Sequence, residues 1–234
     1  MLGFLLLVGQ DLLAQAAAPN SGRIEGSVTL SSDVTGRRRA ARPYTSRGPS
    51  AQAGRTSADT NELQHVVVYL ERVSSAAPAR RPAAPAIIQA QESFAPHILP
   101  IVAGTTVEFP NSDPLFHNVF SLSRARTFDL GRYPRGASKS VRFDSPGVVQ
   151  VFCHIHADMA AVILVLENSY FAVADSAGRF AIDNVPPGQY RIVAWHERIQ
   201  PAVQNVAVRA GMVSRIDYQI PLPSPEPSNV ARSR

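Results

Sequence analysis

The chain is predicted to be an all-β protein that contains two β-sandwiches. Short segments rich in Val, Ile and Phe recur along the sequence, and residues that favour turns, such as Gly, Pro, Asn and Asp, separate them. No long stretch repeats apolar residues with the period of a helix. The length of 234 residues suits two small domains or one large β domain.

A first sandwich is expected over residues 85–168. Short apolar segments in this region are strand candidates, and together they are enough to build one sandwich core. They are residues 87–90, 98–102, 105–109, 119–121, 140–143, 148–152 and 162–166.

Strand candidates on both sides of this region are expected to form a second sandwich. They are residues 24–30 and 66–70 before it, and residues 174–182, 185–193, 203–208 and 216–220 after it. The C-terminal strands alone are too few to close a sandwich core, so the N-terminal strands would complete it. We therefore predict that the first sandwich is inserted in or adjoins a second one, formed by residues 19–84 and 169–222.

The remaining segments are predicted to lie outside both cores. Residues 1–18 are typical of an export signal, because an apolar core at residues 2–8 precedes small residues at 14–18. A buried helix and a plain membrane anchor are the alternatives. No other apolar run approaches the length that crosses a bilayer, so we expect an extracytoplasmic, periplasmic protein without stable membrane insertion after signal removal. Residues 31–61 and 223–234 are predicted to be a disordered loop and a tail.

The net charge of +5 comes mostly from arginine and is unevenly distributed. Part of it lies in the loop of residues 31–61, at Arg37, Arg38, Arg39, Arg42, Arg47 and Arg55. Nucleic-acid binding is not expected, because Tyr44 is the one aromatic residue of this segment and export would remove the usual ligand. A solvated basic loop that docks an acidic partner or an anionic surface is the favoured interpretation.

The single cysteine of the chain predicts a metal site. An exported chain with one cysteine cannot form an internal disulfide, so Cys153 is an inert thiol, an intermolecular bridge or a ligand. His156 and Met159 follow it at intervals of three residues, and His117 lies upstream after a loop. A thiolate, two imidazoles and a thioether are the donors of a type-1 (blue) copper electron-transfer site. We therefore predict that these four side chains bind one copper ion.

Residues beside the predicted ligands are expected to support them. The side-chain amide of Asn118 can tie the two ligand loops together. Four apolar side chains would exclude water from the site; they are Phe116, Phe120, Phe152 and Ile155. His154 either competes for the metal or points outward. Zinc is the competing metal, but Met159 argues against it because a thioether is a poor zinc ligand.

Several motifs between residues 86 and 166 resemble those of one protein family. They are Phe-Ala-Pro at 94–96, Ala-Gly-Thr-Thr-Val at 103–107, Phe-Pro-Asn-Ser-Asp at 109–113, His-Asn-Val at 117–119 and Cys-x-x-His-x-x-Met at 153–159. This region resembles the cupredoxins, with ligand spacing similar to amicyanin and to plastocyanin-like methylamine-utilisation proteins. The resemblance implies a Greek-key sandwich and the ligands His117, Cys153, His156 and Met159. It also implies electron passage through the exposed His156 edge and a contact from the Asn118 backbone N–H to the thiolate. Ala157 departs from the family, which often has proline there.

The flanking strands resemble a different module. Its motifs are Gly-Arg-Ile-Glu-Gly-Ser-Val at 22–28, the hairpin at 175–180 and Val-Pro-Pro-Gly-Gln-Tyr at 185–190. They resemble the carboxypeptidase-regulatory-like sandwiches, which are of transthyretin or immunoglobulin-like type. The resemblance implies a non-catalytic module.

Three functions fit these features. The first is an exported type-1 copper protein that carries single electrons between unidentified redox partner proteins. The second is a copper carrier or sensor, and the third is a non-catalytic surface interaction protein with a vestigial cupredoxin. Enzymatic activity is not expected, because copper oxidases need further paired histidines. His65 and His97 are predicted to be isolated surface residues, and residues 195–197 to be a strand end rather than a polar cluster between the domains.

Overall fold

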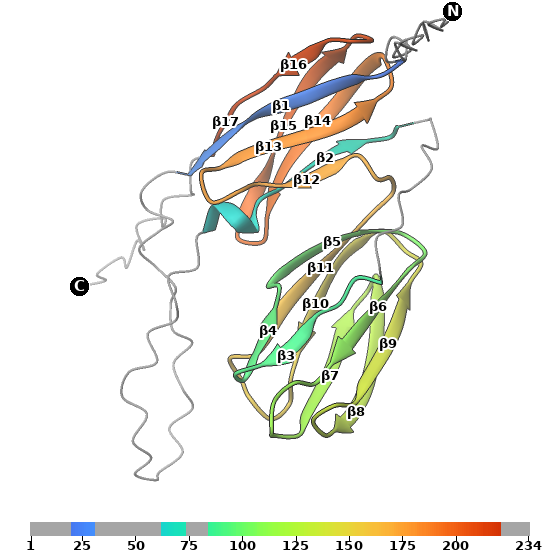
Figure 1. Cartoon of the computed structure of the whole chain (residues 1–234), viewed down its shortest axis with the longest axis vertical. Coiled ribbons are helices and arrows are strands. Elements are labelled where there is room, and N and C mark those ends of the chain that lie inside the picture. The colour runs from blue at the N-terminus through green and yellow to red at the C-terminus, as the bar shows by residue number, and fades with distance from the viewer. Residues whose placement is uncertain (1–19, 31–61, 74–83, 221–234) are drawn as a thin grey trace, which may run out of the picture.

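The computed structural model describes residues 20–30, 62–73 and 84–220. The predicted export signal, the Arg-rich loop and the C-terminal tail lie outside these ranges. Within them the chain is nearly all β, with seventeen strands and one 3-10 helix, η1 (Glu62–His65). Figure 1 shows the strands arranged in two separate sandwiches, an upper and a lower one. The predicted all-β class with two sandwiches is confirmed. None of the described residues form a helix that is long and apolar enough to cross a bilayer.

The lower sandwich contains the strands β3 to β11. Its larger sheet has the strand order β5-β11-β10-β7-β8, while β6 pairs with β9 and β3 pairs with β4. The strands are β3 (Ile88–Ala90), β4 (Ser93–Ala95), β5 (Ile98–Val102), β6 (Thr105–Pro110), β7 (His117–Ser123), β8 (Arg126–Tyr133), β9 (Ser138–Phe143), β10 (Gly147–Phe152) and β11 (Ala160–Leu166).

Alternating side chains build the core of the lower sandwich. In β6, Val107 and Phe109 are buried while Glu108 between them is exposed, as expected for a strand with one face on the core. The same alternation buries Val149 and Val151 in β10. β11 differs, because it is buried on both faces from residue 161 to residue 166.

The upper sandwich combines strands from both ends of the described chain. β1 pairs with β13, β16 and β17, and the second sheet has the order β12-β2-β14-β15. Each sheet of the upper sandwich therefore contains one N-terminal strand beside C-terminal strands. The predicted domain boundaries, at residues 19–84, 85–168 and 169–222, stay a prediction. The strands are β1 (Gly22–Leu30), β2 (Val67–Glu71), β12 (Phe171–Val173), β13 (Arg179–Val185), β14 (Gly188–His196), β15 (Ile199–Val208), β16 (Val213–Arg215) and β17 (Tyr218–Ile220).

Two glycines in the sequence motifs of the upper sandwich occupy positions where the fold requires glycine. A Cβ atom at Gly26 would overlap the carbonyl oxygen of Ile216, so β1 requires glycine where this segment crosses it. Ile216 lies between β16 and β17, which splits the strand that was predicted over residues 216–220. Gly178 has a positive φ of 78° in the turn before β13, where Asp175 accepts the Ala177 and Arg179 backbone N–H groups.

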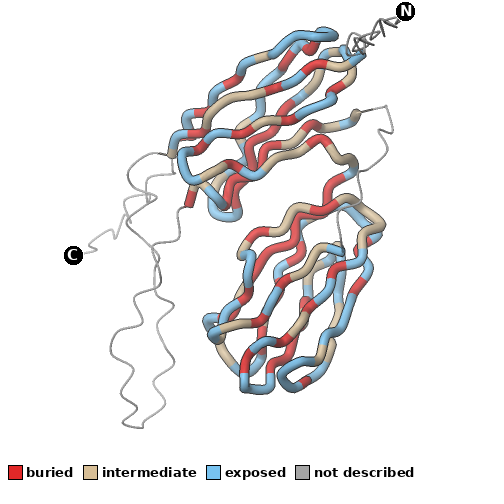
Figure 2. Tube along the Cα trace, in the orientation of Figure 1, coloured by how far each residue is buried: buried red, intermediate tan, exposed pale blue. Residues whose placement is uncertain are grey.

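The two sandwiches meet through apolar side chains on β11 and its neighbours. Val162, Leu164 and Leu166 of β11 share one buried cluster with Val67 of β2 and Trp195 of β14. This contact explains why β11 is buried on both faces. Figure 2 shows the buried residues running along the strands of both sandwiches, including those at the junction.

Candidate metal centre

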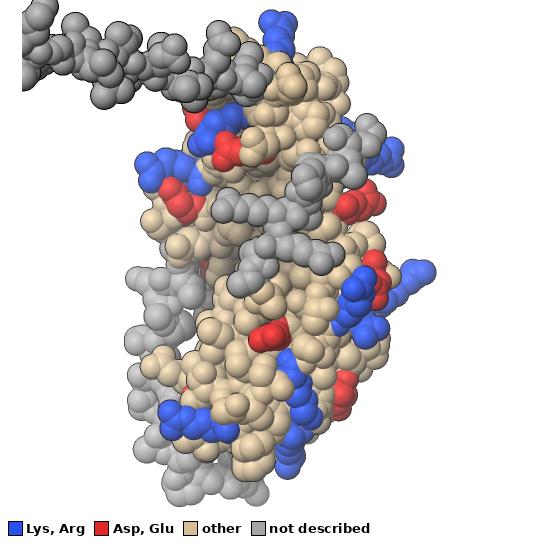
Figure 3. All heavy atoms as spheres, turned by 45° about the vertical axis from the view of Figure 1, so that its right-hand side comes forward, with Lys and Arg blue, Asp and Glu red and all other residues tan. Residues whose placement is uncertain are grey.

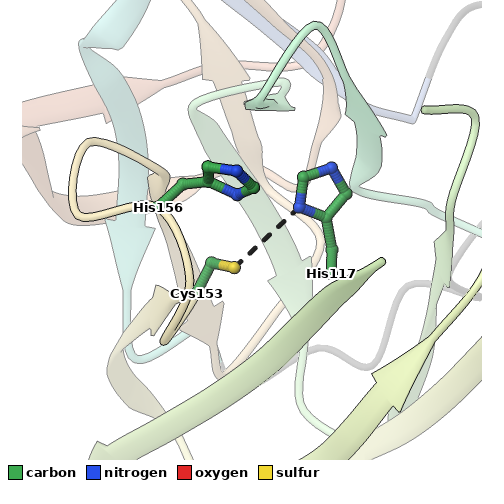
Figure 4. A group of neighbouring side chains, drawn as sticks. All are labelled: His117, Cys153 and His156. Atoms are coloured by element: carbon green, nitrogen blue, oxygen red, sulfur yellow. Dashed lines mark hydrogen bonds between the residues drawn. The ribbon is translucent and has the colours of Figure 1, made fainter. Parts of the chain in front are cut away.

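His117, Cys153 and His156 come together at one end of the lower sandwich. His117 is the first residue of β7, Cys153 directly follows β10, and His156 lies in the loop before β11. Their potential ligand atoms all lie within 4.8 Å of one another. The Cys153 Sγ atom is 4.0 Å from the His117 Nδ1 atom, and Figure 4 shows the three side chains pointing toward one another. These three predicted ligands therefore form one cluster.

The loop that carries Cys153 and His156 is closed by its own backbone. The Cys153 N–H donates to the Met159 carbonyl at 3.3 Å, and the Met159 N–H donates to the His156 carbonyl at 3.1 Å. Phe152 and Ala160 pair across β10 and β11 at the base of the loop. Met159 is buried in the same apolar core as Cys153, so the fourth predicted ligand lies inside the sandwich.

Asp113 fixes the His117 ring. The fully buried His117 donates from Nε2 to the Asp113 carboxylate at 2.7 Å, which leaves its Nδ1 lone pair facing the Cys153 sulfur. The backbone N–H groups of Gln91 and Glu92 donate to the same carboxylate at 2.5 and 2.8 Å. Burial raises the pKa of Asp113, but these hydrogen bonds outweigh burial and leave the pKa below its usual value.

Sequence reasoning missed Asp113. The available signal was its place in the turn sequence Asn-Ser-Asp-Pro, four residues before His117.

His156 offers an unsatisfied buried nitrogen to the cluster. Its Nδ1 atom is buried and has no hydrogen-bond partner, whereas its Nε2 atom lies 3.7 Å from the Glu92 carboxylate. A buried polar atom without a partner costs about 1–3 kcal/mol. One thiol sulfur and two imidazole nitrogens around a single point suit copper or zinc, which are the common metals for such donors. The residues present therefore fit a metal ion.

Asn118 links the ligand loop to the neighbouring strand. Its Oδ1 atom accepts the His154 N–H at 3.4 Å, and its Nδ2 atom donates to Asp129 of β8 at 2.6 Å. The side-chain amide thus connects the loop after β10 with β7 and β8.

The side chains expected to exclude water differ in exposure. Phe116 is 57% exposed and Ile155 is 40% exposed, whereas Phe120 and Phe152 are partly buried, so their role in excluding water stays a prediction. The ring of the exposed His154 lies 3.8 Å from the Phe120 ring and is outside the metal-ligand cluster. His154 therefore points outward.

The prediction that His65 and His97 are isolated surface residues is wrong. His65 is buried, and its ring centroid lies 4.7 Å from that of His97. The His97 Nε2 atom lies 2.8 Å from the Glu197 carboxylate. His196 ends β14 and also belongs to this group through Glu62, so the polar cluster between the domains exists beside the strand end. The sequence gives little indication of this polar cluster, because its residues are far apart along the chain.

Comparisons with known proteins cover only parts of the chain. A family model described as "Polysaccharide lyase family 4, domain II" matches residues 159–215, which run from the end of the ligand loop to β16. A search of curated protein sequences found no match.

Three solved structures are similar to part of the chain. A Cu-containing nitrite reductase (NirK) from Thermus scotoductus SA-01 is 28% identical over 41% of this chain and 25% of that chain, with a TM-score of 0.35. A purple cupredoxin from Nitrosopumilus maritimus is 24% identical over 35% of this chain and 98% of that chain, with a TM-score of 0.32. An amicyanin mutant in the Cu(I) form is 18% identical over 42% of this chain and 97% of that chain, with a TM-score of 0.34. Because these TM-scores are low, the function has to be inferred from the side chains themselves.

Proposed function

We propose that this chain is an extracytoplasmic type-1 copper protein of the cupredoxin kind, which carries single electrons between redox partner proteins. The proposal rests on the cluster of one thiol sulfur and two imidazole nitrogens, which lie within 4.8 Å of one another; His117 and Cys153 are buried and His156 is partly exposed. The His117 Nδ1 lone pair faces the sulfur, and the His156 Nδ1 atom has no hydrogen-bond partner. A metal ion would satisfy both nitrogens.

His117, Cys153, His156 and Met159 are the proposed ligands. Cysteine sulfur favours copper in its Cu(I) state, and imidazole suits both Cu(I) and Cu(II). The buried thioether of Met159 favours copper over zinc, because a thioether is a poor zinc ligand. A copper ion bound there supplies a one-electron couple between Cu(I) and Cu(II).

The protein holds these donors in a fixed arrangement. Asp113 orients His117, Asn118 ties down the loop after β10, and the paired strands β10 and β11 close the base of that loop. A fixed donor arrangement limits the movement that accompanies a change of charge, which favours rapid electron transfer.

His156 provides the route to the surface. Its side chain is 21% exposed, whereas that of His117 is fully buried. Exposed Leu115, Phe116 and Ile155 lie on the same two ligand-bearing segments and offer apolar surface to a redox partner. Figure 3 shows basic and acidic side chains interspersed over one face of both sandwiches, so we propose no nucleic-acid partner.

The other parts of the chain complete the proposal. The export signal predicted from the sequence of residues 1–18 favours a periplasmic location, and we propose no stable membrane insertion after its removal. The upper sandwich serves as a non-catalytic module of the carboxypeptidase-regulatory-like kind, and we assign no enzymatic activity to the chain.

Visible absorption of the copper-loaded, oxidised full chain tests the proposal. We expect one copper per chain and an intense band from thiolate-to-Cu(II) charge transfer. The Cys153→Ser variant should lose the band, and the His154→Gln variant should keep it. A band that survives Cys153→Ser would overturn the proposal. Voltammetry then separates the two copper functions, since a fast reversible response indicates electron transfer and a slow one a copper carrier.

A further inference from the structure

A second group of metal-binding side chains lies where the two sandwiches meet. Figure 1 shows η1 and the β14–β15 turn at the end of the upper sandwich that faces the lower one. The apolar side chains of Ile98 and Trp195 belong to the buried cluster at this junction. The group consists of Glu62 and His65 of η1, His97 just before β5, His196 at the end of β14 and Glu197 in the turn that follows.

His65 is the least satisfied member of this group. Its side chain is only 8% exposed, and its Nδ1 atom has no hydrogen-bond partner. The Oε2 atom of Glu62 lies 3.5 Å from that nitrogen, and the centroid of the His97 ring lies 4.7 Å from the centroid of the His65 ring. Burial, aided by the neighbouring His97, lowers the pKa of His65, so the ring is neutral at neutral pH. Its unpartnered nitrogen therefore lies among carboxylate and imidazole groups.

His97 is oriented as metal-binding histidines are. Its Nδ1 atom lies 3.0 Å from the Ala160 carbonyl oxygen, which can only accept, so the ring proton sits on Nδ1. The Nε2 atom then points at the Glu197 carboxylate 2.8 Å away. Two lone pairs face each other there unless a second proton or a metal ion lies between them. A backbone carbonyl that fixes the far nitrogen is the usual partner of a metal-ligating histidine.

His196 has a different role. Its Nδ1 atom accepts the Arg198 backbone N–H at 3.2 Å, so its proton is on Nε2, which donates to Glu62 at 3.1 Å. The Arg198 side chain also contacts the same Glu62 oxygen at 2.8 Å. His196 and Arg198 thus position Glu62 beside His65, and in this tautomer His196 has no free lone pair for a metal.

The remaining distances fit a single small ion. The ligand atoms of His65, His97 and Glu197 all lie within 4.8 Å of one another. Two donors on a tetrahedral zinc ion lie about 3.3 Å apart, given bonds of about 2.0–2.1 Å. The 2.8 Å between the His97 Nε2 atom and the Glu197 carboxylate is shorter than that value, whereas Glu62 belongs to a separate group with His65 and His196.

We propose that His65, His97 and Glu197 form a second metal site that binds one zinc-like divalent ion. Imidazole and carboxylate donors without sulfur suit Zn²⁺ rather than Cu(I). His97 belongs to the lower sandwich, and His65 and Glu197 belong to the upper one. A bound ion therefore joins the two sandwiches and fixes their relative orientation.

Zinc binding to the full chain in the Cys153→Ser background tests this site, because that substitution removes the sulfur of the other centre. With Zn²⁺ alone as the probe, we expect equilibrium dialysis to give one ion per chain and the thermal midpoint to rise. Adding His97→Gln or Glu197→Gln should weaken zinc binding more than tenfold. His154→Gln, an exposed histidine away from the junction, is the matched control and should leave zinc binding unchanged.

NMR of the histidine side chains tests the same zinc site without further substitutions. Imidazole ¹⁵N chemical shifts of the Cys153→Ser chain should move on zinc addition for His65 and His97, and should stay constant for His154. Absence of zinc binding, unchanged affinity in the two junction variants, or constant His65 and His97 shifts would each overturn the site. His97 and Glu197 would then be an ordinary ion pair. The outcome does not depend on copper binding at Cys153.

Discussion

The two histidine clusters differ in donor atoms and in how the chain assembles them. The cluster at Cys153 contains sulfur and lies within one sandwich, with two of its donors in a single loop. The cluster at the junction contains carboxylates instead, and its residues come from η1, the segment before β5 and the turn after β14. The first therefore needs only the lower sandwich to be folded, whereas the second needs both sandwiches in contact.

Because their donor atoms and their positions in the fold differ, the two clusters are expected to prefer different metals and to respond to different substitutions. A thiolate with imidazoles selects copper, and imidazoles with carboxylates suit zinc. Damage to the junction should abolish the second cluster and spare the first. Changes close to Cys153 should do the reverse.

The largest expected effect comes from the junction itself. Trp195 is buried between the sandwiches and directly precedes His196, so Trp195→Ala should lower the free energy of unfolding by about 3–5 kcal/mol. Zinc affinity should fall with it, while the copper band at Cys153 persists. Urea unfolding, zinc dialysis and visible absorption measure the three quantities. Loss of the copper band in a folded variant would show that the two clusters are not independent.

A smaller effect is expected from the residue that orients His117. Asp113→Asn removes the negative charge that accepts from His117 and from two backbone N–H groups. Copper affinity should fall about 10- to 100-fold, or about 1.4–2.7 kcal/mol. Competition with a copper chelator measures it. Asp144→Asn is the control, because that carboxylate is exposed and pairs with Arg142; equal losses in both variants would contradict the role of Asp113.

The junction should also respond to pH in metal-free protein. Burial lowers the pKa of His196, so below about pH 6.5 the unfolded chain takes up protons that the folded chain does not. Stability should therefore fall as pH drops from 7.5 to 5.5, by at most about 1.4 kcal/mol per pH unit for this histidine. Urea unfolding in EDTA, with His196→Gln as the comparison, isolates the effect. A difference between the two proteins that is constant over this range would refute it.

The smallest effect is expected at the histidine next to Cys153. His154 is exposed and contacts Phe120, so His154→Gln should change the free energy of unfolding by less than about 0.5 kcal/mol. The copper band should keep its position and intensity. A displaced band would indicate that His154 competes for the metal.

Strands with strong alternation could be predicted from the sequence, and weak edge strands could not. β6 and β10 place Val or Phe at every second position, so their signal is local. β8 was missed because it lies at the edge of its sheet and only Tyr133 is buried. β4 and β12 were missed because three residues are too few to show a period.

The two clusters also differ in how far the sequence alone could predict them. Cys153 and His156 lie close in the sequence, and a lone cysteine draws attention, so this cluster could be proposed without coordinates. Asp113 was missed because its link to His117 depends on how one loop folds back. The junction cluster depends on the packing of β11 against β2 and β14, and nothing in a single sequence records which faces of two sandwiches touch.

Copper K-edge X-ray absorption of the copper-loaded full chain identifies the atoms that bind the copper ion. We expect one sulfur and two imidazole nitrogens as the nearest neighbours of the copper ion in the native chain. The sulfur contribution should disappear in Cys153→Ser and remain in His154→Gln. A copper ion surrounded only by nitrogen and oxygen in the native chain would contradict the proposed copper site.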